Sequence, residues 1–194
     1  ILETLVGFDT TSRNSNLELI DWVEGYLADL GAQTERYASE DGRKANLHAT
    51  LGPDEDGGVV LSGHTDVVPV DGQDWSSDPF SLEKRDGRYY GRGTCDMKGF
   101  IACTLAHAPR FAEADLKRPV HFAFSYDEEV GCLGAPAMIR AMAGGSPKPS
   151  LVIVGEPTEM RVVTGHKGLF SMRVELTGAE AHSSRVDDGA CAVT

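Results

Sequence analysis

The sequence predicts an α/β fold in which a mixed, largely parallel sheet is sandwiched by helices. Apolar runs at 58–62, 120–125 and 151–154 have the length and composition of buried strands. Segments with apolar residues at helical spacing, such as 17–30, alternate with these runs along the chain. Strands that alternate with helices in this way favour a sheet that is covered on both faces.

The remaining elements follow from periodicity and turn residues. Phe80 to Tyr90 predicts a hairpin that turns at Asp86-Gly87. The helix expected at 97–114 contains Pro109, which predicts a kink or a break there. Alternating apolar and polar residues at 169–176 predict a half-exposed strand. Further helices are expected at 1–8 and 133–142, and further strands at 33–37 and 46–51.

The change in pattern after the last apolar run predicts a domain boundary near Lys167. We expect one domain at 1–166 and the start of a second, incomplete one at 167–194. Ile1 is not an initiator residue, and residues 187–190 look like the beginning of a helix. We therefore expect the chain to be part of a longer protein.

Composition excludes several classes of function. The net charge of −12 argues against a nucleic-acid or an anionic-membrane surface, because both need clustered lysine and arginine. No apolar run approaches the roughly 20 residues that span a bilayer. No CxxC pair occurs among the four cysteines, and the chain is long and apolar enough to fold without disulfides. Both features favour reduced thiols and a cytoplasmic location.

Acidic and imidazole side chains follow each of the three apolar runs. His64 and Asp66 follow the first run, Asp127, Glu128 and Glu129 the second, and Glu156 the third; Asp96 lies in a glycine-rich turn before the long helix. Sites in open α/β sheets form at the carboxyl ends of strands, so these groups should converge. Carboxylates this close repel one another unless a cation lies among them, which predicts a site for one or two divalent metals. Histidine with carboxylates suits zinc, with cobalt or manganese also possible.

Each of these features also has an ordinary structural explanation. A single His-x-Asp is more often a hydrogen-bonded rim residue, an isolated Asp-Glu-Glu is usually a solvated loop, and Gly91-Arg92-Gly93 without a third glycine is a turn rather than a nucleotide motif. Their joint occurrence favours the metal site, although spacing alone leaves both interpretations open.

Four motifs resemble, in order, those of the co-catalytic zinc deacylase and carboxypeptidase family. They are SGHTDVVP at 62–69, GRGTCDMKG at 91–99, DEEVG at 127–131 and GEPT at 155–158. The resemblance implies a zinc-dependent hydrolase that cuts linear amide bonds and holds two zinc ions, for which cobalt can substitute. It also implies a cis peptide bond between Asp96 and Met97.

The resemblance also implies a role for each matching residue. Asp96 would bridge the two ions, His64 and Glu156 would complete one, and Glu129 would serve the other. Asp66 would orient the His64 ring. Glu128 would be the general base that takes a proton from a metal-bridging water and passes it to the leaving amine.

One metal ligand of the family has no counterpart in the sequence. The second zinc takes a further histidine from near the C-terminus of family members, and none of His48, His107, His121 or His166 lies in the matching motif. We expect these 194 residues alone to hold one metal well and the second poorly.

The last segment resembles the beginning of the family's lid and dimerisation domain. The matching histidine there is His182, which would stabilise the oxyanion across the boundary of a homodimer. His166 lies at the hinge and is a weaker candidate for substrate binding.

Within the family, the residues around Cys95 and at 165–168 look most like those of the acetylornithine deacetylase branch. That likeness implies removal of the acetyl group from N-acetylornithine, a step of arginine biosynthesis. Two alternatives stay open. One is a sister enzyme such as succinyl-diaminopimelate desuccinylase, a dipeptidase or an aminoacylase, and the other is a binding module or inactive fragment without catalysis.

Overall fold

The computed structural model describes residues 1–145, 147–165, 167–168 and 172–193. The chain divides into two compact units, Ile1–Glu159 and Met160–Thr194. All the predicted metal-site residues fall in the first unit, whereas His182 belongs to the second. The two units are described separately.

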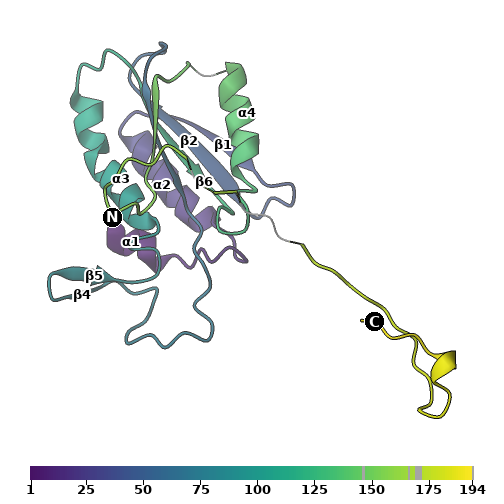
Figure 1. The fold of residues 1–194 in the computed structure, drawn as a ribbon. Coiled ribbons are helices and arrows are strands. Elements are labelled where there is room, and N and C mark those ends of the chain that lie inside the picture. Colours follow the sequence, from purple (N-terminus) through teal and green to yellow (C-terminus); the bar gives the residue numbers. More distant parts are fainter. Residues whose placement is uncertain (146, 166, 169–171, 194) are drawn as a thin grey trace. The chain divides into compact units, whose positions relative to one another are not determined.

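A five-stranded mixed sheet forms the centre of the first unit, in the order β1-β2-β6-β3-β7 (Figure 1). Its strands are β1 (Gln33–Ala38), β2 (Ala45–Leu51), β3 (Val59–His64), β6 (Val120–Ser125) and β7 (Leu151–Val154). The pairs β1–β2 and β2–β6 are antiparallel, and β6–β3 and β3–β7 are parallel. The predicted mixed α/β class is confirmed. A separate hairpin of β4 (Glu83–Arg85) and β5 (Arg88–Tyr90) turns at the predicted Asp86-Gly87.

Helices cover both faces of this sheet (Figure 1). The main core lies on the face covered by α1 (Leu2–Gly7), α2 (Leu17–Asp29) and α3 (Lys98–Glu113), which pack against side chains such as Leu47 and Phe122. The opposite face carries α4 (Ala135–Gly145), where Met138 packs on Val60 and Ala123. Neighbouring residues of β6 therefore point to different cores, as the alternation of side chains along a strand requires.

Helix α3 continues through Pro109, so the predicted break does not occur. Proline has no backbone N–H and leaves the carbonyl four residues earlier without its usual donor. That carbonyl belongs to Leu105, and the Tyr26 hydroxyl of α2 donates a hydrogen bond to it at 3.1 Å. A contact between two helices thus satisfies the group that Pro109 leaves open.

Strand β7 differs from the prediction of a buried strand. Its four residues are all exposed, and Ile153 retains 41% of its accessible surface. An apolar run is compatible with a buried strand, but burial depends on what covers it. Among the described residues, β7 pairs only with β3 and forms one edge of the sheet.

The described residues of the second unit contain little regular structure. The predicted strand at 169–176 is not formed at 172–176, and residues 169–171 lie outside the described residues. Where a helix was expected at 187–190, there is one turn of 3-10 helix, η1 (Val186–Asp188), followed by an isolated bridge between Ala179 and Ala190. In the described part of the chain, we find no helix with both the length and the apolarity to cross a membrane.

Candidate metal centre

The carboxyl ends of three neighbouring strands bring the predicted ligands together. His64 ends β3 and is paired with Ser125, the last residue of β6. The Asp127–Glu129 loop follows β6, and Glu156 follows β7 on the other side of β3. Because β6, β3 and β7 run parallel, their carboxyl ends meet at one edge of the sheet, as the sequence predicted.

His64 lies at the centre of the cluster and is almost completely buried. Its Nδ1 is 2.8 Å from the backbone carbonyl of Asp66, which can only accept a hydrogen bond. Nδ1 therefore carries a proton, and Nε2 is left to face the carboxylates. Asp96 Oδ1 is 3.0 Å from Nε2, Glu156 Oε1 is 3.8 Å away, and Glu128 Oε2 is 3.9 Å away.

This arrangement requires a positive charge at Nε2. A neutral imidazole would direct a lone pair at Asp96, so either a proton or a metal ion must lie between them. Burial alone would lower the pKa of His64, but hydrogen bonds and charge from Asp66 outweigh it and raise the pKa to about 9. A metal ion at Nε2 would neutralise the same negative field.

Two carboxylates near His64 have raised pKa values because they are partly buried and because negative groups are crowded there. Burial and then the charge of Asp96 raise the pKa of Glu129. Burial also raises the pKa of Glu156, where Asp96 and Glu128 add to it and His64 opposes it. Each carboxylate makes it harder for its neighbours to ionise. A bound cation would stabilise their ionised forms.

Two groups of side chains could each hold a metal ion. One consists of His64, Asp96 and Glu156, and the other of His64, Glu128 and Glu129; within each group, the ligand atoms lie within 4.8 Å of one another. Nitrogen and carboxylate oxygen donors in this number suit zinc and related divalent ions. The residues present therefore fit a metal centre.

Asp66 lies behind the cluster and is also buried. Its Oδ1 accepts a hydrogen bond of 3.0 Å from the Glu128 backbone N–H, and its Oδ2 accepts one of 3.2 Å from the Glu129 N–H. Hydrogen bonds from His64 and Ser12 lower the pKa of Asp66 against the opposing effect of burial. Asp66 thus remains ionised and holds both the His64 ring and the acidic loop.

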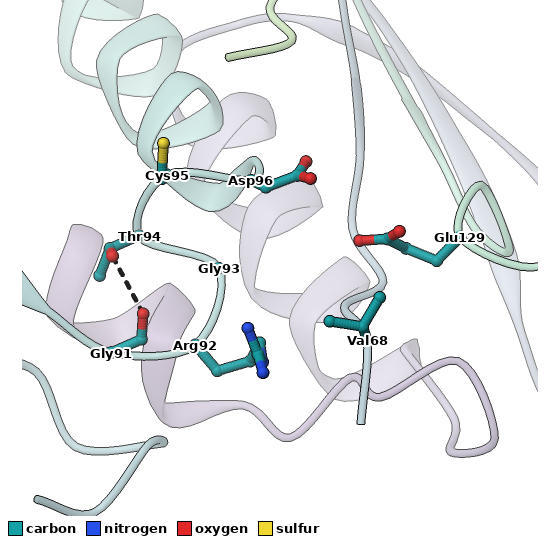
Figure 2. Close-up of a pocket in the computed structure, with 8 residues that line it drawn as sticks. All are labelled: Val68, Gly91, Arg92, Gly93, Thr94, Cys95, Asp96 and Glu129. Carbon is teal, nitrogen blue, oxygen red and sulfur yellow. Dashed lines mark hydrogen bonds between the residues drawn. The ribbon is translucent and has the colours of Figure 1, made fainter. Parts of the chain in front are cut away.

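The glycine-rich turn forms one wall of a pocket of about 190 Å³ beside the cluster. Figure 2 shows the carboxylates of Asp96 and Glu129 projecting into the same space from opposite walls. Thr94 closes the turn by donating a 2.9 Å hydrogen bond to the Gly91 carbonyl. The predicted cis peptide bond between Asp96 and Met97 is confirmed.

Comparison with known families gives one match over most of the chain. Residues 60–192 match the sequence profile of peptidase family M20/M25/M40. The chain belongs to peptidase family M20/M25/M40. The matched region contains all four motifs of the metal centre.

Curated M20/M25/M40 relatives include acetylornithine deacetylases. The chain is 38% identical over 191 residues to that of Pasteurella multocida (strain Pm70), covering 98% of this chain and 49% of the relative. It is 41% identical to that of Myxococcus xanthus, covering 99% of this chain and 50% of the relative. The chain thus spans about half the length of the curated relatives it matches.

Solved structures show the same fold. Human carnosine dipeptidase 1 superimposes with a TM-score of 0.68 at 24% identity, over 79% of this chain and 37% of that one. A metallo-carboxypeptidase from Sulfolobus solfataricus superimposes with a TM-score of 0.69 at 21% identity, over 79% and 36% of the two chains.

Two predicted site residues lie outside this cluster. His182 is exposed in the second unit, where its Nδ1 lies 2.9 Å from Ser184 Oγ. His166 lies outside the described residues. The oxyanion role of His182 and the substrate-binding role of His166 stay predictions.

The sequence interpretation missed two residues that contact the centre from behind. Ser12 donates a 2.7 Å hydrogen bond to Asp66 Oδ2, and Lys44 forms an ion pair with Asp127. Both lie far from the motifs in sequence. For Ser12, the only available signal was the run of polar residues at 9–16, which is typical of any turn.

Proposed function

We propose that the complete protein is a zinc-dependent amide hydrolase that removes the acetyl group from N-acetylornithine, as in arginine biosynthesis. The imidazole–carboxylate cluster at the strand ends is the observation that carries the hydrolytic chemistry. The choice of substrate is supported by the curated relatives, which are named acetylornithine deacetylases. A sister enzyme that acts on a succinyl-amino acid or a dipeptide would need a similar cluster. The assay below therefore includes such substrates.

We propose that the cluster holds two divalent ions. His64, Asp96 and Glu156 would hold one of them, and Asp96 and Glu129 would contribute to the other. Such ions polarise a carbonyl and lower the pKa of water toward neutrality. The grouping of His64, Asp96 and Glu156 supports the first ion. Because His64 Nδ1 donates to the Asp66 carbonyl, only Nε2 can bind an ion, so the second ion would rely on carboxylates.

Glu128 is our candidate for the general base. Its Oε2 lies 3.9 Å from His64 Nε2, and about a third of its side chain is exposed, so it can reach both the metal site and an incoming substrate. It would accept a proton from the attacking water and donate it to the nitrogen of the leaving amine. Water and the amide are thereby converted to acetate and ornithine.

Other assignments follow from the same proposal. His182 would stabilise the oxyanion, and the region after residue 167 would form part of a homodimer interface. A reducing, cytoplasmic location is supported by Cys95, Cys103 and Cys132, which are exposed free thiols.

The test is a hydrolysis assay on the full-length protein loaded with zinc or cobalt. N-acetylornithine, succinyl-diaminopimelate and a simple dipeptide are compared by kcat/KM. We expect the highest value for N-acetylornithine. A higher value for another substrate would correct the substrate, and no turnover of any of the three would refute the hydrolase proposal.

Glu128→Ala distinguishes a general base from a metal ligand, the two roles that the geometry allows for Glu128. As the general base, its loss should lower kcat by about 10²–10⁴-fold and leave the bound metal unchanged. A fall in bound metal, measured by atomic absorption, would instead make Glu128 a ligand. Glu113→Ala removes an exposed carboxylate from the end of α3 and is the matched control.

A further inference from the structure

The acidic loop that carries Glu128 and Glu129 is held from behind by a segment near the N-terminus. Residues 10–12 run beside residues 65–67, with Thr11 and Val67 forming a parallel bridge. Ser12 N–H donates a 3.1 Å hydrogen bond to the Val67 carbonyl, and the Thr10 hydroxyl donates one of 2.6 Å to the Thr65 carbonyl. This segment is therefore fixed against the chain that contains His64 and Asp66.

Ser12 fixes the Asp66 carboxylate. Its hydroxyl donates a 2.7 Å hydrogen bond to Asp66 Oδ2, and both side chains are buried. Asp66 in turn accepts the backbone N–H groups of Glu128 and Glu129, one on each oxygen. A rotation of this carboxylate would displace both backbone amides. The Ser12 hydroxyl therefore helps to fix the backbone from which the Glu128 and Glu129 side chains extend.

Lys44 joins the same segment to the same loop by a second route. Its Nζ donates to the Ser12 carbonyl and also pairs with the Asp127 carboxylate. The side chains of Lys44 and Asp127 are only 17% and 13% exposed, so solvent weakens this ion pair less than a surface pair. Asp127 has a positive φ of 57°, a conformation that its side-chain partner helps to hold.

We propose that Ser12 and Lys44 are positioning residues for Glu128 and Glu129, acting through Asp66 and Asp127. The inference rests on the proposed function, because it assumes that these two glutamates act in catalysis and metal binding. Proton transfer depends on tenths of an ångström in the placement of the base. His64, Asp96 and Glu156, by contrast, would reach the first metal from other elements. The His64 ring is fixed by the backbone carbonyl of Asp66, which the Ser12 hydroxyl does not contact.

The experiment uses the full-length protein and the variants Ser12→Ala and Lys44→Met. We expect kcat on the best substrate to fall by about 10–100-fold, as for other residues that orient metal ligands, while KM changes by less than about twofold. Ser12→Thr and Lys44→Arg keep the hydroxyl and the charge, and should restore most of kcat. Ser150→Ala and Lys117→Met make the same chemical changes away from the site and should behave as wild type.

Cobalt titration of the metal-free variants gives a readout that needs no activity. We expect the first equivalent to bind as in wild type, and the visible absorption of the second to shift, because Glu129 is less well placed. If the wild-type protein hydrolyses none of the substrates, the proposed function fails, yet the cobalt spectra still test Ser12 and Lys44.

The positioning proposal is overturned by either of two results. One is a kcat within about twofold of wild type for both Ser12→Ala and Lys44→Met, together with unchanged cobalt spectra. The other is a loss of kcat that follows a loss of folded protein in circular dichroism and that the conservative variants do not reverse. Because Ser12 and Lys44 are changed separately, one variant still tests the proposal when the other folds poorly.

Discussion

Asp66 illustrates how one buried carboxylate can hold several parts of a site in place. Its two oxygens accept the N–H groups of Glu128 and Glu129, and Oδ2 also accepts the Ser12 hydroxyl. Its Oδ1 is 3.6 Å from His64 Nδ1, close enough to stabilise a positive charge on the His64 ring. The residue therefore contacts both the ring and the acidic loop of the candidate metal centre.

Asp66→Asn tests this role at nearly constant shape. One oxygen becomes an NH₂ group, which cannot accept a hydrogen bond, so in either orientation at least one amide of the acidic loop loses its acceptor. The negative charge that supports His64 is also lost. We expect about 10–100-fold lower kcat or metal affinity, measured by steady-state kinetics and by competition with a chelator. Asp115→Asn on the surface is the control, and equal values for the two variants would contradict the role.

At the scale of elements, the site depends on how closely the end of β7 approaches α3. Gly155 lies between β7 and Glu156, and a Cβ at this position would come within 2.0 Å of the Phe100 ring. Real side-chain carbons never approach so closely, so only glycine fits. The sequence interpretation placed Gly155 in the motif, but the contact that requires it comes from a helix 55 residues earlier in the chain.

Gly155→Ala should displace Glu156 and weaken metal binding. Either Phe100 or the end of β7 must move to accommodate the new methyl group, and Glu156 is the next residue after Gly155. We expect lower zinc affinity in calorimetric titration, with kcat reduced in proportion to the metal lost. The double variant with Phe100→Ala makes room for the methyl group and should recover affinity. Unchanged affinity in the single variant would contradict the displacement of Glu156 and would show that Phe100 moves instead.

At the scale of the first unit, the two faces of the sheet are packed differently. The face under α1, α2 and α3 is aliphatic and aromatic. The opposite face buries a pair of histidines, His48 on β2 and His121 on β6, whose Nε2 and Nδ1 atoms are 3.3 Å apart. Burial and then the charge of the neighbouring ring lower the pKa of His48 to about 4, and burial lowers that of His121.

This histidine pair predicts a loss of stability in mild acid. Between pH 6.5 and about 4, the unfolded chain binds a proton at His48 that the folded chain does not. The free energy of unfolding therefore falls as the pH falls, by at most about 1.4 kcal/mol per pH unit for each such proton. Urea denaturation of the metal-free protein between pH 7 and 4.5 measures this slope.

The double variant His48→Gln/His121→Gln should give a shallower slope over the same range. His107→Gln changes an exposed histidine on α3 and should keep the wild-type slope. If the double variant kept the full slope, the acid sensitivity would have to come from groups whose pKa is lowered in the folded chain, such as Asp66.

Much of the fold and the candidate ligand set could be predicted from the sequence. Local signals were sufficient for the strands that end at His64 and Ser125, because apolar runs and turn residues act within a few positions. The grouping of His64, Asp96, Glu128, Glu129 and Glu156 also followed, since parallel strands bring their carboxyl ends to one edge. Burial was harder to predict, as β7 shows, because it depends on what packs against a strand.

The sequence by itself thus determined the family motifs, the order of the elements and the residues that converge on the metal centre. Only the tertiary structure decided that Ser12 and Lys44 contact this centre, that Phe100 excludes a side chain at Gly155, and that His48 meets His121. Each of these contacts joins residues more than 30 positions apart, and no local pattern encodes them. They arise from the stacking of segments on the sheet, where packing and hydrogen bonding between distant side chains are decided together.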